Sequence, residues 1–307
     1  MPSESEFIAA FLAPFGGGEG VGSDCAAVRV GRGMKLVATT DAVVQDVHFT
    51  LPAFSPEEVG WKALAVNLSD LAAAGARPRW FLCALGVPQS PRALPLAARM
   101  AKGMAALARR FDCALVGGNV SRASEWSLTL TALGEARRPL LRTGARPGDA
   151  LVVVGKLGDA AAGLRGARRG LPAQRRPVPL VAQGIAAARF ASASIDVSDG
   201  FLRDLGHLCA MSRCGAEVEL SALPVGRAAR ARADRMELAL TGGEDYALLY
   251  AVPRRKLAAL RRAVRCTVVG RMVRGHAITL LENGARFRPP SATGFDHLQA
   301  RSPKPEA

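Results

Sequence analysis

Aspartates stand in three short segments of this 307-residue chain, beside hydroxyl side chains and glycine. We expect each segment where a strand or a helix meets a loop. Hard divalent cations prefer clustered carboxylate and carbonyl oxygens, and Mg²⁺ is usually held by a few carboxylates together with substrate phosphates. The segments therefore predict a site for several magnesium ions that handles a nucleotide. They are residues 39–41, 68–75 and 196–200, which contain Asp41, Asp70, Asp196 and Asp199.

The chain as a whole is strongly basic, with 41 Lys and Arg residues against 26 Asp and Glu. Proteins that bind nucleic acids usually cluster their basic residues and interleave them with aromatic side chains. Here arginine is scattered, and the densest basic runs, 165–176 and 227–235, contain no aromatic residue. We therefore expect no nucleic-acid partner, and two readings of the charge stay open: an anionic small molecule as partner, or the codon bias of the source genome.

Several observations bear on where the protein works. The longest apolar runs are strand-sized and broken by glycine or charge, so we expect no membrane-spanning segment. The first six residues are polar and acidic, without the basic start of a secretory signal. The six cysteines form no Cys-x-x-Cys pair, which favours reduced thiols. We expect a cytoplasmic protein.

A helix expected at 56–74 positions the second aspartate segment. Ser55 has the side chain of an N-cap, and Gly75 is a plausible stop. Asn67 and Asp70 then lie on one otherwise apolar helix face, by the spacing of three residues. Two polar residues are unusual on a packing surface, which favours a functional role for Asp70.

The rest of the chain alternates between strands and helices, which indicates an α/β or α+β fold in each half. Turn residues at 142–149 place a boundary near residue 145. We expect a loop at 165–180. The other expected strands are 28–39 (interrupted at 31–33), 80–87, 113–116 (ending in Gly-Gly-Asn), 126–133, 151–154, 194–197, 217–220, 245–252 and 267–269, and the other expected helices are 91–111, 200–214 and 253–264.

The usual nucleotide motifs are missing. The sequence has no Gly-x-x-x-x-Gly-Lys-Ser/Thr loop, no dinucleotide fingerprint and no protein-kinase catalytic loop. If the chain transfers phosphoryl groups, it therefore uses another scaffold.

Two long segments, TTDAVVQDVHF (39–49) and GWKALAVNLSDLAAAGA (60–76), closely resemble the thiamine-monophosphate kinase family. Five shorter motifs follow the order found in that family, and the match runs from about residue 7 to about residue 295. These motifs are GVGSD (20–24), GGN (117–119), RTGARPGD (142–149), IDVSDG (195–200) and TGGEDY (241–246).

The resemblance implies a two-domain fold like that of aminoimidazole-ribonucleotide synthetase. Residues 1–145 would form an α/β (α+β) domain that binds Mg²⁺ and ATP, and residues 146–307 an α/β domain that completes the active site. The N-terminal domains would pair across a homodimer into a β-barrel. The implied activity is ATP-dependent phosphorylation of thiamine monophosphate to thiamine diphosphate, the last step of thiamine diphosphate biosynthesis, with several Mg²⁺ ions at the domain junction.

The resemblance also implies roles for individual residues. Asp41, Asp70 and Arg142 would be catalytic, through positioning and neutralisation of charge. The positions that match metal ligands are Asp24, Thr39, Thr40, Asp41, Asp70, Asn119, Asp196 and Asp199. Those that match ATP contacts are Gly118, Asn119, Arg142 and Ser198. His48 and Glu244 match contacts to thiamine phosphate, and Phe295 aligns loosely with an aromatic residue near that substrate.

Two positions depart from the family pattern. Ser23 and Asn119 stand where the family commonly has aspartate. An amide oxygen can ligate Mg²⁺ but brings no charge. We therefore expect one ion to be bound more weakly or placed differently, with activity retained.

Structural roles compete with the functional ones. Asp41 could cap a helix or a turn, and Asp70 could be a surface residue. Asp196 and Asp199 could cap the following helix, which is compatible with phosphate binding at the same helix end. A lone His48 is more often structural, and Glu244 follows a Gly-Gly pair that could be an ordinary turn. Two alternatives stay open for the whole chain: another ATP-dependent enzyme of the superfamily, or a non-catalytic nucleotide-binding protein.

Overall fold

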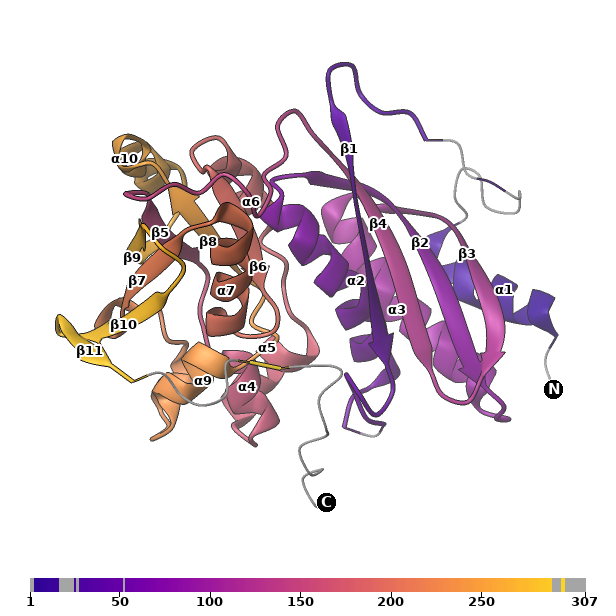
Figure 1. Cartoon of the computed structure of the whole chain (residues 1–307). Coiled ribbons are helices and arrows are strands. Elements are labelled where there is room, and N and C mark those ends of the chain that lie inside the picture. The colour runs from indigo at the N-terminus through magenta and orange to yellow at the C-terminus, as the bar shows by residue number, and fades with distance from the viewer. Residues whose placement is uncertain (1–2, 17–24, 26–27, 52, 289–293, 296–307) are drawn as a thin grey trace.

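The computed structural model describes residues 3–16, 25, 28–51, 53–288 and 294–295. Two sheets lie side by side, one in each half of the chain (Figure 1). Helix α2 (Pro56–Ala73) lies between them, because it packs on the first sheet and also contacts helix α6 and strand β6 of the second half. No helix within the described residues is long and apolar enough to cross a membrane.

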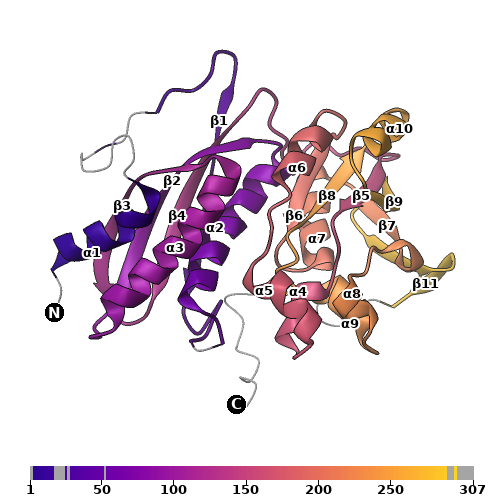
Figure 2. The same ribbon diagram turned by 180° about the vertical axis from the view of Figure 1, so that it is seen from behind.

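The first sheet has four strands in the order β1-β4-β2-β3, and only the β2/β3 pair is parallel. Helices α2 and α3 cover one face of this sheet, with α1 beside them (Figure 2). The elements are α1 (Glu4–Leu12), the 3₁₀ turn Ala13–Phe15, β1 (Lys35–Val44), α2, β2 (Arg77–Pro88), α3 (Ala93–Phe111), β3 (Ala114–Ala123) and β4 (Ser127–Ala136).

Sequence features explain how α2 begins and how closely it packs. Ser55 accepts a hydrogen bond from the Glu58 amide and Glu58 bonds back to the Ser55 amide, which is a capping box. A Cβ atom at Gly60 would collide with the carbonyl of Met100, and one at Gly103 would collide with that of Glu57. The two glycines therefore let the backbones of α2 and α3 touch.

The opposite face of the first sheet is open, and no described element covers it. In Figure 1 this face is turned to the viewer, with α2 and α3 behind it. Alternate residues of β1 point to it and are exposed, and their register partners on β4 extend the same surface. Within the described residues the sheet is open and forms no closed barrel. The exposed β1 residues are Leu36, Ala38, Thr40 and Ala42.

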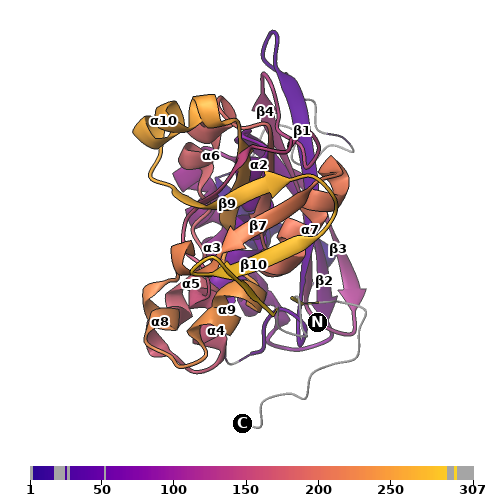
Figure 3. The same cartoon turned by 60° about the vertical axis from the view of Figure 1, so that its left-hand side comes forward.

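The second sheet has seven strands in the order β11-β10-β7-β9-β5-β8-β6. Figure 3 shows β9, β7 and β10 running side by side at the outer end of this half. The elements are β5 (Ala150–Val154), α4 (Asp159–Leu164), α5 (Leu171–Arg175), α6 (Val181–Ala188), β6 (Ala193–Val197), α7 (Phe201–Ser212), β7 (Gly215–Glu219), α8 (Arg227–Arg230), α9 (Arg235–Thr241), β8 (Ala247–Val252), α10 (Arg254–Ala263), β9 (Thr267–Val273), β10 (Ile278–Glu282), β11 (Ala285–Phe287) and the 3₁₀ turns Arg168–Gly170 and Leu220–Ala222.

The two faces of the second sheet belong to different cores. On one face, Leu151 and Val153 of β5 pack with the apolar residues of α7 and α9. On the other face, Val152, Val154 and Tyr250 belong to the same buried cluster as α2 and the first sheet. One hydrophobic core is therefore shared between the two halves.

Some expected elements differ from the structure. The strand expected from residue 28 begins only at Lys35 and continues to Val44, so Asp41 lies inside a strand and not at its end. Gly117, Gly118 and Asn119 lie within β3 rather than in a loop after it. The expected loop 165–180 contains a 3₁₀ turn and helix α5.

Candidate active site

Three carboxylates meet at the junction of the two halves, each from a different element. Asp41 lies on β1, Asp70 on α2 and Asp196 on β6, and both other carboxyl groups lie within hydrogen-bonding reach of Asp70. Thr39, two residues before Asp41 and therefore on the same side of β1, donates from Oγ1 to Asp70 Oδ2 at 2.5 Å. Ser69 donates from Oγ to Asp196 Oδ2 at 2.7 Å.

Burial raises the pKa of each carboxyl group, and the charge of Asp70 adds to the rise at Asp41 and Asp196. Burial, assisted by the charge of Asp70, raises the pKa of Asp41 to about 7, although one side of the residue is open to solvent. Burial raises the pKa of Asp70, while the hydrogen bond from Thr39 opposes the rise. Burial also raises the pKa of Asp196 well above its ordinary value, and the charge of Asp70 adds to this. Raised pKa values oppose full ionisation of all three groups near pH 7, and a cation among them would favour the ionised forms.

The donor atoms of this cluster are all oxygens: three carboxyl groups and the hydroxyl of Thr39. Hard cations such as Mg²⁺ take oxygen ligands, whereas sulfur and imidazole favour softer transition metals. The residues present therefore fit Mg²⁺, which would relieve the repulsion that raises the pKa values.

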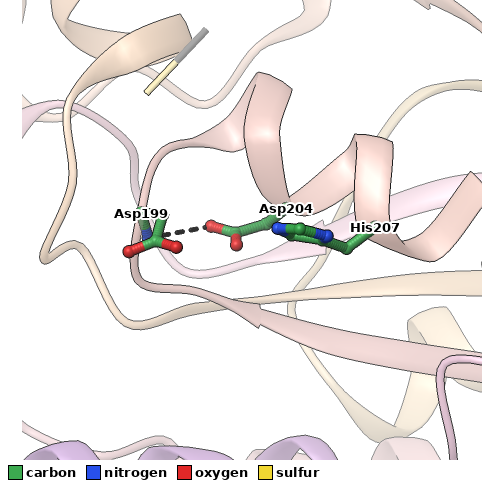
Figure 4. Close-up of side chains that lie close together, drawn as sticks. All are labelled: Asp199, Asp204 and His207. Atoms are coloured by element: carbon green, nitrogen blue, oxygen red, sulfur yellow. Dashed lines mark hydrogen bonds between the residues drawn. The ribbon is translucent and has the colours of Figure 1, made fainter. Parts of the chain in front are cut away.

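The loop between β6 and α7 is held by one buried carboxylate. Asp204, 3% exposed, accepts hydrogen bonds at Oδ2 from the amides of Ser198, Asp199 and Gly200, at 3.0, 3.0 and 3.1 Å. Figure 4 shows Asp204 reaching back from α7 to Asp199. Burial raises the pKa of Asp204 to about 7, with the charge of Asp199 adding to the rise and the three amides opposing it. These three hydrogen bonds fix the loop. The loop lies next to the carboxylate cluster, since the charge of Asp199 contributes to the raised pKa of Asp41.

His207 lies beside Asp199 and Asp204 in Figure 4, and each of the three offers a ligand atom within 4.8 Å of the others. One oxygen of Asp204 is already occupied by three backbone amides. We therefore assign Asp204 to holding the loop and not to a metal.

Arg142 supplies a positive charge at the same junction. Its side chain is exposed, and its charge opposes the rise in the pKa of Asp70. Its carbonyl accepts a hydrogen bond from Ser212 Oγ at 2.7 Å, which ties the segment after β4 to the end of α7. The guanidinium is therefore close to the carboxylate cluster and open to solvent, as a group that meets a phosphate must be.

Glu244 stands in a strained loop next to Ser198. Its φ is 68°, and that of Tyr246 is 48°, a region that favours glycine. The Glu244 amide donates to the Ser198 carbonyl at 2.7 Å. Asp245 accepts hydrogen bonds from the amides of Gly158 and Ala160 at 2.6 and 3.3 Å, which holds the loop from its other side.

His48 lies in a turn directly after β1. Its Nδ1 accepts a hydrogen bond from the amide of Val44 at 3.1 Å, so the network places the ring proton on Nε2. Its carbonyl accepts from Lys62 Nζ at 3.0 Å, and Lys62 also pairs with Glu244. The two residues expected to contact the acceptor are thus linked through Lys62.

Phe295 meets the loop after β6. Its amide donates to the carbonyl of Asp199 at 2.9 Å, and its side chain is half exposed. The C-terminal aromatic residue therefore lies beside one of the expected metal ligands.

The structure does not bring every expected residue into the cluster. Thr40 donates to the carbonyl of Leu130 at 3.0 Å, and its hydroxyl points to the open face, away from Asp70. Gly118 and Asn119 lie on the far edge strand β3, level with Asp41 and Ala42 respectively through the registers of β2 and β4. Three strand spacings put them about 14 Å away from β1. Asp24 and Ser23 lie outside the described residues.

Sequence reasoning missed three residues of this junction: Ser69, Asp204 and Lys62. Asp204 carried a signal, since an acid in the first turn of a helix often bonds the amides before it. Ser69 and Lys62 carried none, because the carboxylates that they contact, Asp196 and Glu244, lie in the other half of the chain.

Comparison with known proteins agrees with this architecture. Residues 22–136 match the N-terminal domain of AIR synthase related proteins, and residues 146–282 match the C-terminal domain of the same proteins. The class defined by the fold and the site is therefore that of the AIR synthase related proteins, with two α/β domains.

Within that class, this chain is similar to proteins named thiamine-monophosphate kinase. Thiamine-monophosphate kinase of Haemophilus influenzae is 35% identical over 303 residues, which is 91% of either chain. The crystal structure of the enzyme of the same name from Stenotrophomonas maltophilia K279a is 34% identical with a TM-score of 0.80, covering 92% of this chain and 97% of that one. The chain belongs to the thiamine-monophosphate kinase family.

Two further solved structures are similar to this chain in fold but differ in sequence identity. One, described as AaThiL complexed with AMPPCP and TMP, is 29% identical, has a TM-score of 0.79 and covers 96% of this chain and 97% of that one. The other, hydrogenase maturation protein HypE in complex with ATP, is 19% identical with a TM-score of 0.78 and covers 93% of this chain and 94% of that one. The second likeness shows the shared fold alone.

Proposed function

We propose that this chain transfers the γ-phosphoryl group of ATP to thiamine monophosphate, forming thiamine diphosphate and ADP. The observation that carries the proposal is the cluster of Asp41, Asp70 and Asp196 beside the loop at Ser198. The names of the relatives and the ligands of the AaThiL structure, an ATP analogue and TMP, support the same reaction.

Asp41, Asp70 and Asp196, with Thr39, would hold Mg²⁺ at the junction. When bound, Mg²⁺ supplies positive charge to the phosphates of ATP and neutralises the charge that develops during transfer. Arg142 supplies a second positive charge from the chain itself. We propose that Arg142 and Ser198 contact the nucleotide, and that His48, Glu244 and Phe295 contact the acceptor.

The acceptor oxygen needs no strong general base, because a phosphate monoester is largely ionised near neutral pH. Catalysis is then mainly the in-line positioning of two bound phosphates and the neutralisation of their charge. Both substrates must therefore be bound together before transfer. Initial-rate plots at varied ATP and thiamine monophosphate should intersect, and parallel lines or ³²P retained on the denatured protein would overturn direct transfer.

We also propose that residues 1–145 form the dimerisation domain and that two such domains pair through their open faces. The open face exposes Leu36 and Ala38, which a second copy would bury. Asn119 is about three strand spacings away from Asp41 within one chain. We propose that the Mg²⁺ and ATP site is completed by Gly118 and Asn119 of the partner subunit.

Light scattering at micromolar concentration should give a dimer, and a monomer would contradict this part of the proposal.

A subunit-mixing experiment tests the shared site. Asp70→Asn and Asn119→Arg each should be inactive alone. Mixed and refolded dimers should recover about a quarter of wild-type activity, because a mixed dimer keeps one site free of both changes. No recovery would place both residues in one chain's site.

The experiment that tests the activity itself is ADP release, measured by a coupled assay, against a panel of phosphorylated acceptors. Turnover with thiamine monophosphate and weak turnover with other phosphate esters is expected. Nucleotide binding without ADP release from any acceptor would favour a non-catalytic protein, and preference for another acceptor would favour a different enzyme of the superfamily.

A further inference from the structure

Lys62 is the most deeply buried cation of the described residues, with 1% of its surface exposed. Lysine is rarely buried in proteins unless its ammonium group is paired. Lys62 lies in the first half of α2, which contacts both halves of the chain.

Three groups surround the Lys62 ammonium. Nζ lies 2.5 Å from Glu244 Oε1, in the loop before β8. It donates to the carbonyl of His48 at 3.0 Å, in the turn after β1. It also lies 5.1 Å from the centre of the Phe54 ring, an attractive cation–π arrangement. One ammonium thus joins a loop of the C-terminal half to a turn of the N-terminal half.

Both anchored segments have backbone conformations that need support. Glu244 and Tyr246 have positive φ, and so has Asp46, two residues before His48. Such conformations are unfavourable for residues other than glycine and persist where surrounding contacts fix them. A contact that holds the two segments to each other therefore also holds the strained geometry of both.

We propose that Lys62 is a positioning residue for the acceptor, which sets the Glu244 carboxylate and the His48 turn at a fixed distance from each other. This inference rests on the proposed function, in which His48 and Glu244 contact thiamine monophosphate. Lys62 occupies Oε1 of Glu244 and leaves Oε2 for the acceptor, whose amino group and cationic ring both suit a carboxylate. Lys62 itself touches neither ATP nor the reacting phosphates in this assignment.

The test measures acceptor and nucleotide binding separately. Lys62→Met keeps most of the side-chain volume and removes the charge. Thiamine monophosphate affinity, measured by calorimetry with a non-hydrolysable ATP analogue present, should fall at least tenfold, and KM for thiamine monophosphate should rise in parallel. KM for ATP should stay within twofold. The control is Lys102→Met, the same change at an exposed position of α3, which should leave all three values unchanged.

A second variant covers the case in which Lys62→Met unfolds. Replacing both partners of a buried pair with apolar residues removes the uncompensated charge and often restores stability. Lys62→Met combined with Glu244→Met should therefore fold, and it should still bind thiamine monophosphate at least tenfold more weakly than wild type.

Glu244→Gln completes a double-mutant cycle. If Lys62 acts through Glu244, Lys62→Met combined with Glu244→Gln should weaken acceptor binding no more than the larger single change does.

The outcomes separate the two proposals. Wild-type binding of thiamine monophosphate by the folded Lys62→Met variant, or equal losses for ATP and acceptor, would overturn the positioning role while leaving the activity in place. A wild-type protein that neither binds nor phosphorylates thiamine monophosphate would overturn both.

Discussion

Two groups of charged side chains meet at the domain junction, the nucleotide end around Asp70 and the acceptor end around Glu244, and their charges are arranged in opposite ways. At the nucleotide end Asp41, Asp70 and Asp196 lie close together and burial raises the pKa of all three, while the charge of Arg142 opposes the rise at Asp70. At the other end one carboxylate, Glu244, is matched by the buried ammonium of Lys62. The first end needs a cation from solution to become fully ionised, whereas the second end has its cation built into the chain. We therefore expect the nucleotide end to respond to Mg²⁺ and pH, and the acceptor end to respond to neither.

The largest effect is expected from Asp70→Asn, which removes the carboxylate shared by the whole cluster. We expect kcat to fall by at least 10³-fold, which is about 4 kcal/mol of transition-state stabilisation. Without Mg²⁺ the folded protein should be as stable as wild type or more stable, because repulsion is relieved. Activity and thermal melts measure both, and near-wild-type kcat at saturating Mg²⁺ would contradict the assignment.

The second prediction concerns stability against pH. The pKa of Asp41 is about 7 in the folded protein and 3.8 ordinarily, so between these values the folded state binds more protons than the unfolded chain. Stability without Mg²⁺ should therefore fall as pH rises from 5 to 8. Asp204 and Asp245, with pKa values raised by burial to about 7 and about 8, add to the same slope.

Mg²⁺ should reduce this pH dependence, because it binds the ionised cluster. Its stabilisation should be larger at pH 8 than at pH 5.5, about 2.7 kcal/mol at a hundred times its Kd. Part of the slope should remain, since Asp204 and Asp245 lie outside the cluster. Calorimetric scans with and without Mg²⁺ measure this, Asp70→Asn is the control, and an equal Mg²⁺ shift at both pH values would contradict the comparison.

Asp204→Asn tests how far the nucleotide end depends on its supporting loop. The change removes the charge that holds the amides of Ser198, Asp199 and Gly200, and hydrogen bonds to charged groups contribute about 1.5–3 kcal/mol each. We expect kcat to fall about 10- to 100-fold and KM for ATP to rise more than KM for the acceptor. Asp112→Asn, at an exposed helix end, is the matched control and should behave as wild type. An acceptor-selective loss would place the loop at the other end of the junction.

The smallest effect is expected from Asn119→Asp, which restores the residue common in the family. The added charge should lower the Mg²⁺ concentration needed for half-maximal activity, with kcat changed by less than about threefold. Titration of activity with Mg²⁺ measures the shift. A raised requirement would mean that Asn119 does not lie near a metal, or that the site has adapted to the amide.

The parts of the fold with strong local signals could be predicted from the sequence. Helix α2 was expected at 56–74 and found at Pro56–Ala73, because Ser55 and Pro56 mark its start unambiguously. The position of Gly118 and Asn119 was wrong, since glycines normally signal a loop, whereas here they continue an edge strand beside β2. Strands β10 and β11 were missed, because they are short and partly exposed.

The residues of the candidate site also differ in whether the local sequence could predict them. The aspartates were found from their sequence motifs, and the structure brings Asp41, Asp70 and Asp196 together. Lys62 could not be found, because nothing near it in the sequence shows that a carboxylate 182 positions later will reach it. Contacts between side chains of the two halves depend on how the halves pack, and a local sequence pattern cannot predict that packing.

The contacts of α2 also determine how the protein unfolds. Ser194 Oγ donates to the Ala73 carbonyl at 2.6 Å, and a Cβ atom at Gly184 would collide with the carbonyl of Ala72, so α2 touches the second half by backbone as well as by side chain. One buried cluster also runs through both halves. Unfolding of either half would expose apolar core residues of the other half to water. Calorimetry should therefore record a single cooperative unfolding transition. A domain swap between related proteins, in evolution or in engineering, should therefore preserve the fold only when both domains are transferred together.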